Sequence, residues 1–231
     1  MVNIKENIAA VRAKIEAAAE KSCRGAEEIK LMGVSKFHPF EAMAAAAPFV
    51  DLLGENRVQE GAEKRRLWQE NPFETPWHLI GQLQKNKARR ALETFDLIES
   101  VDSVELALLL NRILEESGRD FPVYLEINMS HEASKSGADE KDAPKLLEDI
   151  MERCPRLAVL GLMTMAPLDG DEKAVREAFS GLRILRDRLK QQSGLALPEL
   201  SMGMSGDFRY AIEEGSTLVR VGTAIFGERE Y

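Results

Sequence analysis

Eight short apolar segments, separated by stretches with helical periodicity, constrain the fold of this sequence more than any other feature. The predicted strands are 30–35, 50–54, 77–81, 97–101, 123–128, 159–164, 199–202 and 218–221. Strands that alternate with helices form parallel sheets, and eight of them favour a closed (β/α)8 TIM barrel over an open doubly wound sheet. Because 231 residues suit one such barrel, we expect a single domain over residues 1–231.

An additional helix is expected before the first strand. Ile4, Ile8, Val11 and Ile15 recur at helical spacing, which predicts an amphipathic helix that ends near Gly25.

Three further signals mark helix ends. Asp102 followed by Glu105 has the pattern of a capping box, and Gly118 suits a helix C-terminus. Pro144 is typical of a first helical turn.

Charge and composition exclude several functions. A net charge of −8 and a pI near 5.2 argue against nucleic acid as the main partner. The N-terminal segment has scattered charges and no long apolar run, so we expect a cytoplasmic protein with no membrane span. Cys23, Cys154 and the three histidines show no metal-ligand spacing, so no metal site is predicted.

Polar residues gather where predicted strands end, which is where barrels of this kind form their sites. Lys36 follows the first strand and Asn56 the second, while Gly222 and Thr223 follow the eighth. The seventh strand leads into the segment MGMSGD, residues 202–207.

The loops after the seventh and eighth strands predict a phosphate site. Ser205 and Gly206 in one loop, with Gly222 and Thr223 in the other, offer hydroxyl and backbone N–H donors to one anion. Taken singly, each loop is equally consistent with glycines that make turns and a serine that caps a helix. Their occurrence after adjacent strands favours the binding interpretation.

Lys36 has two interpretations. Lysine at a barrel rim is usually a solvated charge. Alternatively, an ε-amine in a partly desolvated barrel mouth loses proton affinity and forms a Schiff base with a carbonyl compound. A phosphate site across the same mouth favours the second, because an aldehyde that carries phosphate describes pyridoxal 5'-phosphate.

Arg220 stands two residues before Gly222, so the two positions share a face of the strand. An arginine facing the pyridine nitrogen would donate a hydrogen bond and keep that nitrogen unprotonated, which disfavours transaminase-like chemistry. A simple ion pair with Glu213 or Glu214 is the alternative.

Seven motifs, in order along the chain, carry a resemblance to a known family. They are GVSK (33–36), GENRVQE (54–60), WHLIGQLQKNK (77–87), INMSHEASKSG (127–137), GLMTMAP (161–167), MGMSGDF (202–208) and GSTLVRVGTAIFG (215–227). The sequence resembles the pyridoxal phosphate homeostasis proteins, which are related to the barrel domain of alanine racemase.

The resemblance implies residue roles. Lys36 would be the Schiff-base lysine and Arg220 the partner of the pyridine nitrogen. Asn56 would line the pocket beside the ring. The phosphate ligands would be Ser205, Gly206, Gly222 and Thr223.

The resemblance also implies a function in vitamin B6 homeostasis. Such a protein keeps free pyridoxal phosphate low and supports amino-acid and keto-acid balance, without established turnover, so no catalytic residue is predicted. Apo forms of pyridoxal-phosphate-dependent enzymes are candidate recipients of the cofactor, and a monomer is expected.

An amino-acid racemase of fold type III is the alternative. Racemisation needs a second acid/base opposite the lysine, typically a tyrosine from a separate β domain. We expect no such domain after Tyr231, and Tyr124 and Tyr210 are not obvious counterparts. His38 is read as part of a turn. A protein without a ligand is a third possibility, and the sequence leaves open whether Lys135 helps the cofactor enter or leave.

Overall fold

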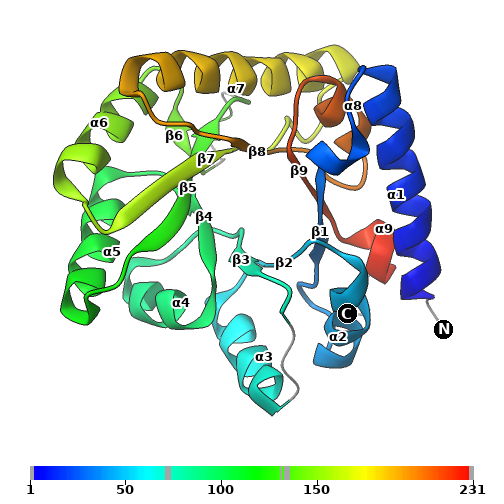
Figure 1. Ribbon diagram of the computed structural model, residues 1–231, viewed down its shortest axis with the longest axis horizontal. Helices are drawn as coiled ribbons and strands as arrows, with labels where there is room; N and C mark the ends of the chain where they lie inside the picture. Colours follow the sequence, from blue (N-terminus) through cyan, green and yellow to red (C-terminus); the bar gives the residue numbers. More distant parts are fainter. Residues whose placement is uncertain (1–2, 71–73, 131, 133–135, 229–231) are drawn as a thin grey trace.

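The computed structural model describes residues 3–70, 74–130, 132 and 136–228. Its centre is a closed barrel of eight parallel strands (Figure 1), which confirms the predicted fold. The barrel strands are β1 (Lys30–Val34), β2 (Leu52–Glu55), β3 (Trp77–Leu79), β4 (Leu97–Val101), β5 (Phe121–Asn128), β7 (Leu157–Met163), β8 (Glu199–Ser201) and β9 (Leu218–Val221). Pairing of β1 with β9 and of β4 with β5 closes the ring, so the first and last strands are neighbours.

A ninth strand, β6 (Ala138–Asp139), was not predicted. It pairs in parallel with the end of β5, where Ile127 lies opposite Ala138. Two residues are too few to show strand periodicity in a sequence.

Helices surround the barrel on the outside (Figure 1). They are α1 (Ile4–Lys21), α2 (Phe40–Ala46), α3 (Val58–Glu70), α4 (Ala88–Thr94), α5 (Val104–Ser117), α6 (Ala143–Arg153), α7 (Glu172–Ser193), α8 (Phe208–Glu213) and α9 (Thr223–Phe226). Three 3-10 turns occupy Ala26–Glu28, Ala47–Phe49 and Lys85–Lys87.

The predicted N-terminal helix is α1, which packs against α8, α9 and α2 at the edge of the barrel. It ends at Lys21 rather than near Gly25. The Ser22 hydroxyl donates to the carbonyl of Ala18 at 2.8 Å, and Cys23 adopts a left-handed φ of 55°, which turns the chain out of the helix.

Two of the three helix-end predictions are confirmed. Gly118 ends α5 with a φ of 64°, and Pro144 lies in the first turn of α6. The capping box at Asp102 was wrong, because α5 begins one residue later. Its N-cap is Ser103, whose side chain makes no capping hydrogen bond in the described structure.

Alternation along the strands separates two apolar cores. On β5, Val123 and Leu125 face the surrounding helices, whereas Tyr124 and Glu126 face the barrel interior. The interior cluster comprises Met32, Val34, Leu52, Leu97, Tyr124, Met163 and Leu218. Lys36 follows Met32 and Val34 in the same alternation, so β1 directs its side chain toward the mouth of the barrel.

Candidate functional site

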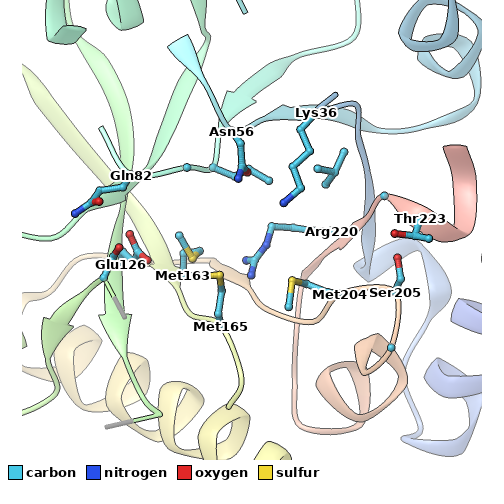
Figure 2. Close-up of a pocket in the computed structure, with 16 residues that line it drawn as sticks. Lys36, Asn56, Gln82, Glu126, Met163, Met165, Met204, Ser205, Arg220 and Thr223 are labelled. Carbon is cyan, nitrogen blue, oxygen red and sulfur yellow. The ribbon is translucent and has the colours of Figure 1, made fainter. Parts of the chain in front are cut away.

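A cavity of about 310 Å³ opens at the carboxyl ends of the strands (Figure 2). Its wall is formed by Val34, Lys36, Asn56, Ile80, Gly81, Gln82, Glu126, Ser136, Met163, Met165, Met204, Ser205, Gly206, Arg220, Gly222 and Thr223. All the predicted site residues are among them, although they come from opposite ends of the chain. The volume lies in the range of small-molecule sites.

Lys36 enters the cavity from the end of β1. Figure 2 shows its amine directed toward the centre, where the Arg220 side chain also points. Asn56 stands beside Lys36 on the next strand end, and its backbone N–H donates to Glu55 Oε1 at 2.8 Å. The amine thus faces a confined, partly polar space.

Arg220 is 4% exposed and fixed by the neighbouring strand ends. One terminal nitrogen donates to both the carbonyl and the hydroxyl oxygen of Ser201 at 2.7 Å, and the other donates to the carbonyl of Thr164 at 2.8 Å. These bonds use three of the five N–H donors of a guanidinium. Within the described residues, donors therefore remain for a ligand.

The predicted alternative for Arg220, an ion pair with a carboxylate, was wrong in the acids that it named. Glu213 and Glu214 contact Arg176 at 2.6 and 3.1 Å on the outside of the barrel. The carboxylate near Arg220 is Glu99, at 4.0 Å, because β4 and β9 direct both side chains into the interior.

Glu99 belongs to a buried polar chain behind the cavity. Its carboxylate accepts a hydrogen bond from the Ser201 hydroxyl at 2.5 Å and lies 2.8 Å from His78 Nδ1. Burial lowers the pKa of Arg220, and the charge of Glu99 opposes that effect. The buried polar residues Glu99 and Ser201 thus keep the guanidinium of Arg220 oriented and charged inside the barrel.

Glu126 lines the cavity and was missed by the sequence analysis. Its side chain is 2% exposed, and its Oε2 has no hydrogen-bond partner among the described residues. Burial raises the pKa of this carboxyl to about 7. The signal that would have found it is its alternation with Val123, Leu125 and Ile127, which places an acid on the interior face.

Two polar loops meet at the other side of the cavity. Figure 2 shows Ser205 and Thr223 on the same side of the cavity, which both residues line. Gly203, with a φ of 95°, turns the first loop, and its carbonyl accepts a hydrogen bond from the Arg220 N–H at 2.9 Å. Thr223 begins α9, whose first N–H groups have no intrahelical acceptor. This donor set suits an anion.

Among the described residues, His38, Tyr124 and Tyr210 are not part of the cavity wall. His38 stacks on Phe226 with ring centroids 5.1 Å apart, which fits its assignment to a turn. Tyr124 is buried edge-on to His78, and burial raises its pKa, while Tyr210 lies under the guanidinium of Arg176. His131, Lys135 and Tyr231 fall outside the described residues.

The described residues lack two kinds of structural feature. They contain no helix with the length and apolar character of a membrane span. They also contain no cluster of histidine, cysteine or acidic side chains arranged to hold a metal ion.

Comparison with known proteins gives one family model and full-length relatives. The family model for the alanine racemase N-terminal domain matches residues 4–230. The pyridoxal phosphate homeostasis protein of Vibrio cholerae is 40% identical, with 100% of this chain and 98% of that protein covered. The protein of the same description from Aquifex aeolicus is 39% identical over the full length of both chains.

Solved structures agree with the sequence comparison. PipY of Synechococcus elongatus with pyridoxal phosphate bound is 37% identical, with a TM-score of 0.84 over 97% of this chain and 100% of that one. Alanine racemase of Clostridium difficile, at 18% identity and a TM-score of 0.75, shares the fold over 98% of this chain and 58% of that enzyme. The chain therefore belongs to the family of pyridoxal phosphate homeostasis proteins, built on the alanine racemase N-terminal barrel.

Proposed function

We propose that this protein binds pyridoxal 5'-phosphate in the cavity at the barrel mouth and holds it as a Schiff base on Lys36. The observation that carries the proposal is the meeting of an amine, a fixed guanidinium and a cluster of hydroxyl donors in one cavity. The structure of the similar protein PipY, which contains bound pyridoxal phosphate, also supports the proposal.

The cavity residues fit the chemistry of this ligand. Ser205, Gly206, Gly222 and Thr223 offer hydroxyl and N–H donors to the phosphate. Asn56 would flank the ring beside Lys36. The donor set is local, so the negative net charge of the protein does not oppose it.

Lys36 would supply the covalent bond. Its nitrogen condenses with an aldehyde carbon, one water molecule leaves, and a C=N bond replaces C=O. The reaction is reversible by hydrolysis and needs no oxidant or second substrate.

Arg220 would face the ring nitrogen. A guanidinium can only donate hydrogen bonds, so it leaves a pyridine nitrogen without a proton. An unprotonated ring is a weak electron sink, which limits carbanion chemistry. The site is therefore suited to holding the cofactor more than to catalysis with it.

We propose a role in pyridoxal phosphate homeostasis and in amino-acid and keto-acid balance, with apo-enzymes as recipients and no turnover of its own. We also propose that the protein acts as a monomer, because the described residues of a single chain already bring an amine, a guanidinium and hydroxyl donors to one cavity. The free thiols Cys23 and Cys154 suit a reducing cytoplasm.

Racemisation is the alternative, and the relatives and solved structures do not favour it. A second acid/base would have to come from the cavity wall, where Glu126 is a titratable carboxyl. Loss of optical rotation in alanine or serine would reveal this activity.

Borohydride reduction followed by peptide mass mapping tests the proposal. We expect the reduced adduct on Lys36 of the purified protein loaded with pyridoxal phosphate. A Lys36→Arg variant should bind the ligand without forming the adduct. Labelling of Lys85 or Lys87, with Lys36 unmodified, would refute the assignment.

A further inference from the structure

A buried ion cluster lies behind the cavity wall, between β2 and α3. The ammonium of Lys64 donates to Glu55 Oε2 and to Glu60 Oε1, both at 2.7 Å. The Lys64 side chain is 7% exposed and that of Glu55 is 0% exposed. Glu60 and Lys64 are four residues apart on α3, so they share one face of the helix.

The cluster holds the peptide groups on both sides of Lys36. Lys64 donates its third hydrogen bond to the carbonyl of Ser35 at 2.9 Å. On the other side, the N–H of Phe37 donates to Glu60 Oε1 at 2.8 Å. The backbone is therefore anchored immediately before and immediately after the amine-bearing residue.

The turn held in this way has an unfavourable backbone conformation. Phe37 has a φ of 65°, a region that bulky residues rarely occupy. Arg57 lies over its ring at 5.0 Å, but the Phe37 residue is 44% exposed, so packing alone does not fix the conformation of the turn. Surrounding contacts must maintain this conformation, and the bond to Glu60 is one of them.

Stability alone does not account for the cluster. Burial raises the pKa of Glu55, and Lys64 opposes that effect. Replacing a buried ion pair with apolar side chains of similar volume is often neutral or stabilising. A cluster that is costly to bury, and that contacts the backbone on both sides of one residue, is better explained by the position of that residue.

We propose that Glu60 and Lys64 are positioning residues that hold the turn 35–37 so that the Lys36 amine points at the aldehyde carbon of the bound ligand. Glu55 connects this cluster to the end of β2, because one carboxylate oxygen accepts a hydrogen bond from Lys64 and the other accepts one from the backbone N–H of Asn56. The inference rests on the proposed function of Lys36.

The test compares two ligands that differ only at the reacting carbon. Pyridoxine 5'-phosphate has the ring and the phosphate but a hydroxymethyl group in place of the aldehyde, so it cannot form a Schiff base. In Glu60→Ala, affinity for pyridoxal 5'-phosphate should fall about tenfold or more, because a displaced amine forms the C=N bond only with strain and the bond then contributes less to binding. Affinity for pyridoxine 5'-phosphate should stay within about twofold, since that ligand forms no such bond.

Two conservative variants separate geometry from charge. Glu60→Gln keeps an oxygen that can accept the Phe37 N–H, so it should retain most of the wild-type affinity. Glu60→Asp keeps the charge but is one methylene shorter, and we expect it to behave like the alanine variant. The aspartate variant also carries the test if the alanine variant does not fold.

Glu213→Ala is the matched control. Like Glu60, Glu213 accepts two hydrogen bonds, here from Lys21 and Arg176. Its side chain is 15% exposed compared with 22% for Glu60, but it lies on the outer helix α8. Its replacement should leave both affinities unchanged.

Equal weakening of both ligands in Glu60→Ala and Glu60→Asp would overturn the inference, because it would indicate general damage to the cavity. Unchanged affinity for both ligands would overturn it as well. Failure of the proposed function is distinguishable, since borohydride would then leave Lys36 of the wild-type protein unmodified.

Discussion

Replacing Ser205 and Thr223 together with alanine removes both hydroxyl groups from the polar side of the cavity. The two residues follow the adjacent strands β8 and β9 and line the same side of the cavity, which leads us to expect that one phosphate accepts from both. We expect the double variant to bind pyridoxal 5'-phosphate much more weakly and to bind pyridoxal, which lacks the phosphate, about as well as before.

The size of the effect follows from the hydrogen bonds lost. A hydrogen bond to a charged group contributes about 1.5–3 kcal/mol, so two contribute about 3–6 kcal/mol if they are additive. That range corresponds to roughly two to four powers of ten in affinity. Because Ser205 is only half-buried and Thr223 is exposed, water competes for the phosphate, and we expect the lower end, about 100-fold.

Equilibrium dialysis of both ligands against wild type and variant measures the difference directly. A Thr94→Ala/Ser180→Ala variant is the control, because those hydroxyls donate to the carbonyls of Arg90 and Arg176, on helices α4 and α7 outside the barrel. If the variant at the cavity weakened pyridoxal and its phosphate equally, the two hydroxyls would not face the phosphate and the assignment would be wrong.

Lys36→Ala should abolish the visible absorption of the loaded protein. It should change the unfolding free energy of the ligand-free form by less than about 1 kcal/mol, because this half-buried lysine contributes little to the core. A collapse of thermal stability would contradict this. The loaded protein should not turn over L- or D-alanine, serine or threonine at the rate of an ordinary enzyme, which is about 1 per second or faster. The assay follows the chirality of the amino acid and the release of keto acid and ammonia. Glu126→Gln should be about as stable as wild type at about pH 3, where the wild-type carboxyl is mostly protonated in both the folded and the unfolded state. Because the folded-state pKa is raised from 4.5 to about 7, the unfolded chain releases this proton first as pH rises, and wild type loses stability relative to the variant over that interval, by about 3 kcal/mol at most. Urea denaturation at about pH 3 and about pH 8 checks this, and a constant difference between the two proteins would refute it.

The sequence predicted the barrel and the cavity residues well because both depend on local order along the chain. Parallel strands place their carboxyl ends at one mouth, so residues directly after strands meet there however far apart they are in sequence. Lys36, Asn56 and Thr223 were found in this way. The roles assigned to them remain predictions, since gathering in a cavity does not show what each residue binds.

Contacts between elements were not predictable in the same way. Lys64 lies on a helix rich in charged residues, and nothing local indicates that β2 presents Glu55 to it. Arg220 contacts Ser201 and Thr164 instead of Glu213 or Glu214, because the barrel turns it inward, away from the acids nearest in sequence. Such partners depend on which faces meet after folding.

Closure of the barrel by β1 and β9 makes ligand binding a late event in the life of the chain. Lys36 and Thr223 come together only after the last strand has been synthesised and has paired with the first. A ribosome-bound fragment that stops before β9 therefore has the amine but neither Arg220 nor the donors that follow it. A ligand that binds only the closed barrel adds about 2.7 kcal/mol to the stability of the barrel when the free ligand concentration is 100 times the dissociation constant. A ligand bound at this mouth would thus raise the stability of each newly closed barrel.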